Sequence, residues 1–378
     1  MAGLAGITPD YLYQIERGKK LPAVPVFVEL ARVLGVSVAH LLAEPPVRPP
    51  GRPAAAVAGL ELHRALTQPA DSCEPPPVPE LHQRVRSAWQ VWQTSPHRYS
   101  QLQAQLPVLV TGVEVAARRY RGDGAHAEWR AVQRCAVDLY TLLRTVTKRI
   151  GQMDLSLLVA DRAMRAAEGA EDPGRLAAAR WNMAHVLLAD RQAEGGEAVA
   201  MQAADELAPL ARAGDLDAIA LSGALILLGA VASARHGQVW TARELVRAAV
   251  PLAARTGERN VHWTAFGPTN VAMYAVSIEV EAGETADALR LAERIDYVHS
   301  PSIERRVAFL LEQAKSHVQR QDYGNALILL QTASHEAPED VTHRPAAHQL
   351  VNTVIHRARR SVATEAARLA TRAGLAVE

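Results

Sequence analysis

Apolar side chains recur with helical spacing over almost the whole chain after residue 78. Similar amphipathic segments each follow a turn signal, and a longer apolar helix precedes each turn. The turns are predicted at Gly151, Gly195-Gly196, Gly237, Gly283 and Asp322-Tyr323-Gly324, roughly 40 residues apart. Self-similarity at this period is typical of stacked helical hairpins, which bury their apolar faces only against their neighbours. The pattern therefore predicts an α-solenoid, with an irregular helical bundle as the alternative.

One stretch is apolar enough to raise the question of a membrane span. It runs from Ile219 to Ala234 and is interrupted by small or polar residues, among them Ser222 and Ser233. It falls short of the ~20 apolar residues that a membrane-spanning helix needs. We therefore expect a buried helix of the core and no membrane partner.

The first 44 residues carry a separate helical pattern. Thr8 is placed to cap a helix that has proline at its first position and the Asp10 carboxylate near the positive end of its dipole. Gly18 ends this helix, and Ser37 caps a short last one. The predicted helices are Pro9–Arg17, about Ala23 to Leu34, and Val38–Leu42. Apolar side chains spaced to form a small common core are Leu12, Ile15, Leu21, Val26, Leu30, Leu34, Val36 and Leu41.

Prolines separate this pattern from the long helical region. Residues 45–80 hold ten of the 22 prolines, and such sequence is extended and semi-rigid. A short helix over Ala54–Thr67 interrupts it. We expect a helical module over residues 1–44, a proline-rich linker over 45–80, and a repeat domain over 81–378.

Composition narrows the class of protein further. The chain has 378 residues, of which 49% are hydrophobic and only 4% aromatic, with a formal net charge of +1. Few aromatic residues and many alanines and leucines favour helices over sheets. The near-neutral charge argues against a wholly basic nucleic-acid coat. Two cysteines are too few for a disulfide framework or a typical zinc site, and the start of the chain lacks the pattern of a signal peptide. An all-α, cytoplasmic protein is expected.

The segment AGITPDYLYQIERGKKLPAVPVFVELARVLGVSVAHLL, residues 5–42, resembles the helix-turn-helix domain of XRE-type (lambda-repressor-like) transcriptional regulators. The resemblance implies that Pro9–Arg17 is the recognition helix, which enters the major groove of DNA with its N-terminal end first. The positions expected to meet bases or sugars are Pro9, Asp10, Tyr11, Tyr13 and Gln14, and those expected near phosphates are Arg17, Lys19 and Lys20. Gln14 is suited to adenine and Asp10 to the amino group of cytosine. Tyr11 and Tyr13 are equally compatible with a purely structural place on the surface or in the core.

The chain departs from the family pattern at its start. A complete domain of this type has a first helix and a whole second helix before the Ala5-Gly6-Ile7 sequence, whereas MAGLAG matches only the end of the second helix. We expect either a start codon placed too late, which we favour, or a copy that binds DNA weakly. The helix-turn-helix is thus expected to be incomplete and poorly stabilised.

The rest of the chain resembles actinobacterial XRE regulators that carry a tetratricopeptide-like domain. The segments with this similarity are 264–276, 289–345 and 350–360. The resemblance implies a transcription regulator that binds an operator of unknown sequence. It also implies that the repeats sense a small molecule or peptide, or form a homodimer, because two half-sites need two recognition helices.

A ligand site is predicted around residues 260–270. Gly267-Pro268 begins a helix whose first N–H groups attract anions. Aromatic and polar side chains lie beside it: Trp263, Phe266, Thr269 and Asn270. The alternative is that the two aromatic residues fill a gap between repeats while Thr269 and Asn270 cap the helix. Arg180 and Asn182, beside Trp181, form a second candidate cluster, because an asparagine amide both donates and accepts hydrogen bonds.

No pattern of enzyme chemistry is recognisable. The sequence has no nucleophile elbow, no phosphate-binding glycine loop and no His-Glu-X-X-His segment. We therefore expect no catalytic residues, no cofactor, no metal and no enzymatic activity. The alternative function is a helical-repeat scaffold that binds a protein or peptide and carries a vestigial DNA-binding module.

Overall fold

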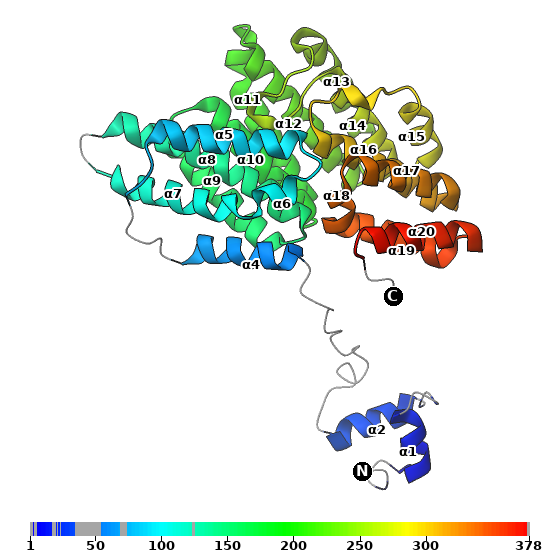
Figure 1. Cartoon of the computed structure of the whole chain (residues 1–378). Helices are drawn as coiled ribbons and strands as arrows, with labels where there is room; N and C mark the ends of the chain where they lie inside the picture. Colours follow the sequence, from blue (N-terminus) through cyan, green and yellow to red (C-terminus); the bar gives the residue numbers. More distant parts are fainter. Residues whose placement is uncertain are drawn as a thin grey trace. The chain divides into compact units, whose positions relative to one another are not determined.

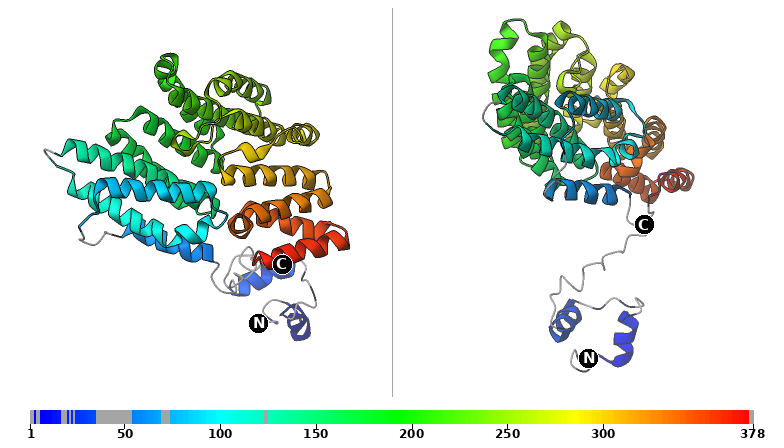
Figure 2. Two further views of the ribbon diagram at one scale, coloured as in Figure 1. Left: turned by 45° about the horizontal axis from the view of Figure 1, so that its top comes forward. Right: turned by 60° about the vertical axis from the view of Figure 1, so that its left-hand side comes forward.

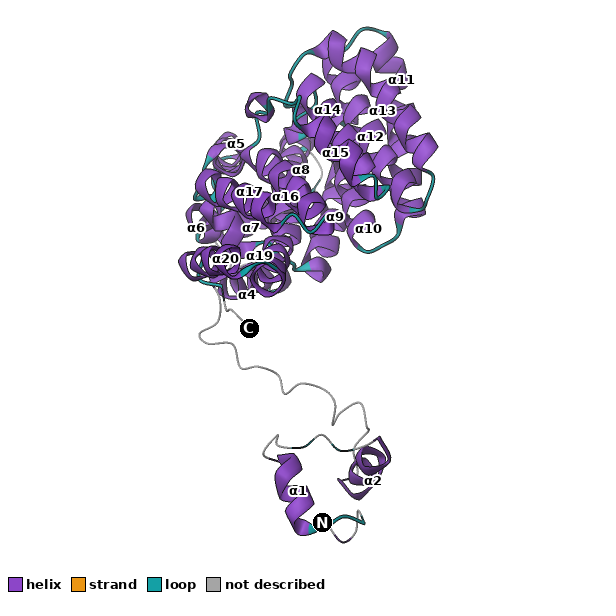
Figure 3. Ribbon diagram, turned by 90° about the vertical axis from the view of Figure 1, so that its right-hand side faces the viewer, coloured by secondary structure: helices purple, strands orange, loops and turns teal. Residues whose placement is uncertain are grey.

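The computed structural model describes residues 3, 6–16, 20, 22, 24–34, 54–68, 74–122 and 125–375. The chain divides into two compact units, Met1–Pro53 and Ala54–Glu378. All the regular elements in the described ranges are helices, as Figures 1 and 3 show. The prediction of an all-α protein is confirmed.

The first unit holds two described helices, α1 (Pro9–Glu16) and α2 (Val24–Leu34). The Thr8 hydroxyl accepts a hydrogen bond from the backbone N–H of Tyr11 at 3.2 Å, so the predicted N-cap is confirmed. Leu30 and Ala31 are buried, whereas Leu34, placed in the core by the sequence pattern, is 42% exposed. The predicted third helix, Val38–Leu42, lies outside the described residues.

The second unit is a succession of helices joined by short turns. They are α4 (Ala54–Thr67), α5 (Val78–Thr94), α6 (Arg98–Gln103), α7 (Gln105–Arg119), α8 (His126–Arg149), α9 (Met153–Ala170), α10 (Pro173–Ala189), α11 (Ala193–Arg212), α12 (Leu216–Arg235), α13 (Val239–Thr256), η2 (Val261–Trp263), α14 (Pro268–Glu281), α15 (Thr285–Ala292), η3 (Tyr297–His299), α16 (Ile303–Gln319), α17 (Tyr323–Glu336), α18 (Pro338–His343), α19 (Pro345–Arg357) and α20 (Arg360–Arg372).

Neighbouring helices of this unit pack in pairs, and each pair packs on the next. The pairs are α8/α9, α10/α11, α12/α13, α14/α15, α16/α17 and α19/α20. The first helix of each pair also contacts the first helix of the following pair, from α8 through α16 to α19. Figure 2 shows this succession from cyan through green and yellow to red. Buried apolar side chains accordingly form successive clusters, around α5 to α9, α10 to α14 and α16 to α20, with a small one between α14 and α16.

The turns agree only in part with the predicted ones. Gly151, Gly237 and Gly283 each close a turn with positive φ (78°, 88° and 80°), where glycine has no steric penalty. The turn placed at Gly195-Gly196 is wrong, because both glycines lie in α11 and the chain reverses at Arg191, with φ 63°. A Cβ on Gly196 would stand 3.2 Å from Leu188 Cγ, so this glycine serves close helix packing.

Helix α4 has the bounds predicted for it within the proline-rich segment. It packs against α7, with Leu62 and Leu66 buried, and the Arg162 guanidinium donates to the Leu66 carbonyl at 2.7 Å. The second unit therefore begins at Ala54 rather than at residue 81.

Helix α12 is the described helix that is long and apolar enough to cross a membrane. Its apolar window is 83% buried inside the protein, between α11, α13 and α14. This is the behaviour of a core helix, and the predicted buried helix over Ile219–Ala234 is confirmed.

Candidate functional site

Helix α1 presents two of the predicted base-reading side chains as a pair. Asp10 and Gln14 are one turn apart, and the Gln14 amide donates to the Asp10 carboxylate at 2.7 Å. The Lys20 ammonium stands 5.6 Å from the centre of the Tyr11 ring, and Tyr13 is 49% exposed. The side chain of Pro9 is not described, and Arg17 and Lys19 lie outside the described residues. The described part of this surface carries hydrogen-bonding, aromatic and cationic groups within one helix and its C-terminal end.

The second unit encloses a cavity of about 60 Å³ between helices that are far apart in the sequence. Its walls come from α5, α8, α10, η2, α14 and α16. We call it the basic cavity, after the cationic and aromatic side chains that line it: Arg144, Lys148, Arg149, Trp181, Trp263 and Arg305.

The cations of this cavity are only partly matched by carboxylates. Arg149 forms an ion pair with Glu304, and Arg305 has the Glu312 carboxylate 3.7 Å from its Nη1. Arg144 is 4% exposed, and the hydrogen bond from its Nε goes to the neutral amide oxygen of Asn182 at 2.5 Å.

Lys148 lies one helical turn after Arg144, and its ammonium donates to the backbone carbonyl of His185 at 3.2 Å. Within the described residues, neither Arg144 nor Lys148 has a carboxylate at ion-pair distance.

Burial and mutual repulsion shift the proton equilibria here. Burial lowers the pKa of Arg144 to about 9. Burial, together with the neighbouring Arg149 and Arg144, holds the pKa of Lys148 well below its usual value. Burial and the Lys148 ammonium likewise hold the pKa of His185 well below its usual value, so this imidazole is neutral at pH 7. The surroundings of the basic cavity therefore destabilise the protonated forms of Arg144, Lys148 and His185, although all three side chains lie close together there.

Aromatic rings frame the cavity. The Trp263 indole stacks on Trp89, with 5.2 Å between ring centroids and 8° between planes, and Trp89 Nε1 donates to the Asp138 carbonyl at 2.7 Å. Trp263 has a φ of 63°, and His262 and Ala265 also have positive φ. Such backbone strain in residues other than glycine persists only where surrounding contacts hold it, and it is frequent at ligand sites.

The structure brings only some of the predicted ligand residues together. Trp263 and Asn270 line the basic cavity, and the Asn270 side-chain oxygen accepts from Arg305 Nε at 3.0 Å. Asn182 does not line it, but its side-chain oxygen accepts the hydrogen bond from Arg144 Nε. Arg180 is elsewhere, paired with Glu206.

Phe266 and Thr269 are also placed outside the cavity lining. Phe266 is fully buried in the core, with its ring over Gly223. The anion at the start of α14 is supplied by the chain itself, because the backbone N–H of Thr269 donates to the Glu258 carboxylate at 2.8 Å.

Sequence reasoning missed the cations of α8 and α16. A signal was present: Arg144, Lys148 and Arg149 lie close together at the end of a long helix whose other residues there are largely buried. Cations one turn apart on such a helix are unusual unless partners from elsewhere in the fold face them.

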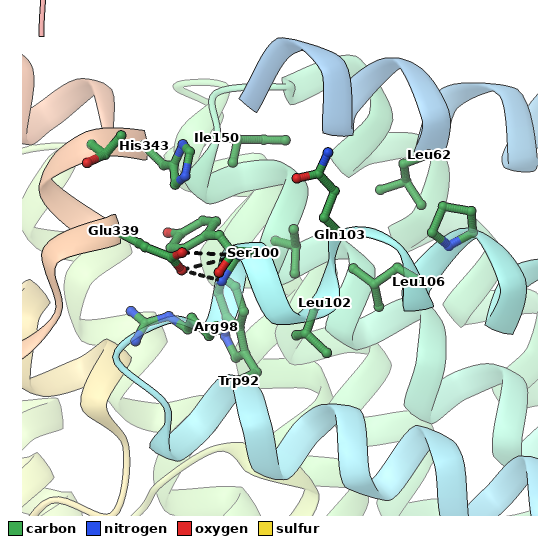
Figure 4. Close-up of a pocket in the computed structure, with 14 residues that line it drawn as sticks. Leu62, Trp92, Arg98, Ser100, Leu102, Gln103, Leu106, Ile150, Glu339 and His343 are labelled. Atoms are coloured by element: carbon green, nitrogen blue, oxygen red, sulfur yellow. Dashed lines mark hydrogen bonds between the residues drawn. The ribbon is translucent and has the colours of Figure 1, made fainter. Parts of the chain in front are cut away.

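A second cavity, of about 230 Å³, lies between α4, α5, α6, α7, α8 and α18. We call it the apolar cavity, after the apolar side chains in its lining: Leu62, Trp92, Leu102, Leu106, Val146 and Ile150. Figure 4 shows the Glu339 carboxylate at one side of it, facing the start of α6. Glu339 accepts from the backbone N–H groups of Tyr99, at 2.8 Å, and Ser100.

A chain of ion pairs joins the linings of the two cavities. Arg98 pairs with Asp340, both with fully buried side chains, and Arg344 pairs with the other oxygen of Asp340. Arg344 Nη2 lies 3.7 Å from the Glu304 carboxylate, which in turn pairs with Arg149. This chain of ion pairs connects α6 and α8, early in the unit, with α16 and α18, late in it.

Comparison with known proteins finds a similarity in the first unit. A helix-turn-helix family model matches residues 1–41, which include α1 and α2. No curated protein matches the chain. Within the described residues, no group of three or more histidine, cysteine, aspartate or glutamate side chains is placed to hold a metal ion. The helix-turn-helix match supports DNA binding of the XRE type and regulation of transcription by this protein.

Proposed function

We propose that the protein is a sequence-specific, DNA-binding transcription regulator whose second unit senses a small effector. The observation that carries the proposal is the helix-turn-helix match at residues 1–41 in the same chain as a helical unit with an enclosed, cation-lined cavity. Small-molecule sites are concave and combine aromatic walls with a few polar groups, as the basic cavity does. A cytoplasmic location is part of this proposal, because the DNA is there.

The order of helix packing supports a tetratricopeptide-like α-solenoid for the second unit. Each helical pair contacts the pairs before and after it, and the first helices of successive pairs contact one another. Residues with positive φ follow the ends of helices at roughly regular intervals: Glu171 follows α9, Gly214 follows α11 and Gly257 follows α13. We assign the sensing role to this solenoid.

Recognition of DNA by the first unit is assigned to α1. Gln14 and Asp10 supply hydrogen-bonding groups for base edges, and Lys20 supplies a charge for a phosphate. Two such helices are needed for two half-sites, so the proposal includes a homodimer.

Selection of binding sequences from random DNA by the full chain tests this function, followed by mobility-shift titration at several salt concentrations. Gln14→Ala is expected to cost about 5- to 150-fold in affinity for the selected site and to relax its sequence preference. Lys20→Ala is expected to weaken binding to all sequences alike and to reduce the salt dependence. Arg247→Ala is a matched control, because this exposed arginine lies on α13 of the other unit and pairs with Glu244.

Equal affinity of the wild-type chain for selected and scrambled DNA would refute sequence-specific regulation. It would favour the alternative, a protein- or peptide-binding scaffold with a vestigial DNA-binding module. The large apolar side chains exposed on the second unit are the observation in favour of that alternative, with Trp240 at 69%, Val298 at 67% and Ile328 at 58% exposed.

A further inference from the structure

We propose that the basic cavity binds the oxyanion group of a small molecule, a carboxylate or a phosphate, between the cations of α8 and Arg305 of α16. The regulatory meaning of this site rests on the proposed function, whereas the binding itself does not. The second unit alone supplies all the groups involved.

The first argument is the imbalance of charge. The cavity lining contains the cations Arg144, Lys148, Arg149 and Arg305 and one carboxylate, that of Glu304. Glu304 is already engaged by Arg149. Arg144 and Lys148 are held by neutral oxygens, those of Asn182 and of the His185 backbone. Arg144 is buried and Lys148 is partly buried. Charges with so little access to water are almost always paired in proteins, so this pair of cations calls for an anion from outside the chain.

The second argument concerns buried hydrogen-bond donors of the cavity lining that have no acceptor within the described residues. Among the residues that line the cavity, the donors Arg305 Nη2 and Trp181 Nε1 are buried without a hydrogen-bond partner within the described part of the chain, as are the acceptors Gln93 Oε1 and Glu304 Oε1. Glu304 Oε1 is already engaged in the ion pair with Arg149. The two donors, on the arginine and the tryptophan, can only donate hydrogen bonds. A carboxylate or phosphate can only accept them at neutral pH, and hydrogen bonds from cations to such groups are short and strong.

The third argument is the volume of the basic cavity. A volume of about 60 Å³ is enough for a few water molecules, each needing roughly 15 Å³ by this measure, and so for one oxyanion group with a few attached atoms. A peptide segment does not fit there. The rings of Trp89, Trp263 and Trp181 lie around the same space, so a small flat group attached to the anion would meet aromatic walls.

Binding at this place would connect distant helices. The unpaired cations belong to α8, early in the unit, and Arg305 belongs to α16, late in it. An anion between them removes their mutual repulsion and holds the two helices through common hydrogen bonds. The bound form is therefore expected to be the more closed and more stable form of the second unit.

Thermal unfolding of the full chain, with isothermal titration calorimetry, tests the site. Inorganic phosphate and acetate, each an oxyanion with few attached atoms, are the probes, and sodium chloride at the same ionic strength is the reference. We expect at least one probe at 10 mM to raise the unfolding temperature above the chloride reference. Comparison of the two probes tells a phosphate site from a carboxylate site. No stabilisation by either probe beyond that of chloride overturns the proposal.

Two variants make the test specific. Lys148→Met and Arg144→Met are each expected to weaken binding of the effective probe at least tenfold, and without ligand each is expected to be as stable as the wild type, since an unpaired buried cation is removed. Lys148→Arg, which keeps the charge, is expected to retain binding. Arg165→Met is the matched control, because Arg165 is 75% exposed on α9 and pairs with Asp161. Unchanged probe affinity in both Met variants overturns the site.

The outcome for the site and the outcome for the proposed function are separable. Probe binding that leaves DNA affinity unchanged supports the anion site and refutes its effector role. Probe binding by a chain that shows no sequence-specific DNA binding supports the site and refutes the regulator. Loss of both responses in Lys148→Met, with retained response in Arg165→Met, supports the site and its role together.

Discussion

Replacement of Gly223 by alanine tests whether Phe266 is a core residue or a free aromatic side chain. Gly223 lies in the middle of α12, and a Cβ at this position would overlap Phe266 Cζ and two further carbons of the same ring. Phe266 is fully buried, and its backbone carbonyl accepts from the Arg259 N–H at 2.8 Å. The ring is therefore enclosed and cannot simply swing away.

Two effects of opposite sign decide the outcome of Gly223→Ala. In a helix interior, alanine is favoured over glycine by about 1 kcal/mol. Forcing an extra carbon into a close-packed core costs about 1–3 kcal/mol. Since these contacts would be far shorter than any real Cβ contact, we take the upper part of that range. The net result expected is destabilisation by about 1–2 kcal/mol.

Urea unfolding followed by circular dichroism measures this change, with two comparisons. Gly195→Ala, in the first turn of α11, has its nearest neighbour at 3.8 Å and is expected to be neutral or stabilising. Phe266→Leu combined with Gly223→Ala is expected to lose less stability than the sum of the single changes, with a coupling of about 0.5–3 kcal/mol. If Gly223→Ala is as stable as the wild type, the ring is not fixed over α12 and the core assignment of Phe266 is wrong.

Three further predictions concern buried groups of the second unit. Burial raises the pKa of Glu304, but Arg149 and Arg344 outweigh it and hold this pKa at about 2, below the ordinary 4.5. Ionised Glu304 therefore stabilises the fold above about pH 4.5, and this contribution is lost as the pH falls towards 2. Glu304→Gln is expected to flatten the acid dependence of the unfolding free energy over that range, and an unchanged slope would contradict the assignment. Asp340→Asn is expected to lower the unfolding free energy by about 3–5 kcal/mol, because the fully buried Arg98 loses its partner. The same change made in an Arg98→Met background should cost clearly less, and simple additivity in urea unfolding would argue against the pair. Burial raises the pKa of Cys135 to about 12, so iodoacetamide at pH 8 should leave this thiol unmodified in the folded chain and modify it in urea. Mass spectrometry of the Cys135 peptide measures this, and rapid modification of the native chain would be inconsistent with its position.

The elements that could be predicted from the sequence are those with a local cause. The bounds of α4 and the cap at Thr8 follow from prolines, a cap residue and periodic apolar positions. The turn at Gly195-Gly196 was misplaced because glycine also serves close helix packing, and here Gly196 faces Leu188 while Arg191 takes the left-handed conformation. Local sequence does not distinguish these two uses of glycine.

The site was predictable only where its residues are neighbours in the sequence. Trp263 and Asn270 come from one segment that the sequence already marks by its aromatic and polar side chains. Arg144 and Lys148 read as ordinary cations of a long helix, and their importance depends on the absence of a carboxylate opposite them. That absence is set by the side chains that α10, α14 and α16 bring to the same cavity, and only the folded chain places them there.

The contact between the early and late helices of the second unit differs in kind from the rest of its core. The apolar clusters follow the order of the chain, and separate clusters surround α5 to α9 and α16 to α20. The contact between these two groups of helices contains a set of polar interactions: the Arg98–Asp340 and Arg149–Glu304 ion pairs and the Glu339 carboxylate at the start of α6. A polar contact of this kind depends on the balance of charge, whereas an apolar one depends on area. Because the basic cavity lies beside Arg149 and Glu304, an anion bound there alters the charge balance of the contact itself. A ligand of a few atoms can in this way influence how firmly helices more than a hundred residues apart are held together, and α4, the first helix after the segment that leads from the DNA-binding unit, packs on the same early group of helices.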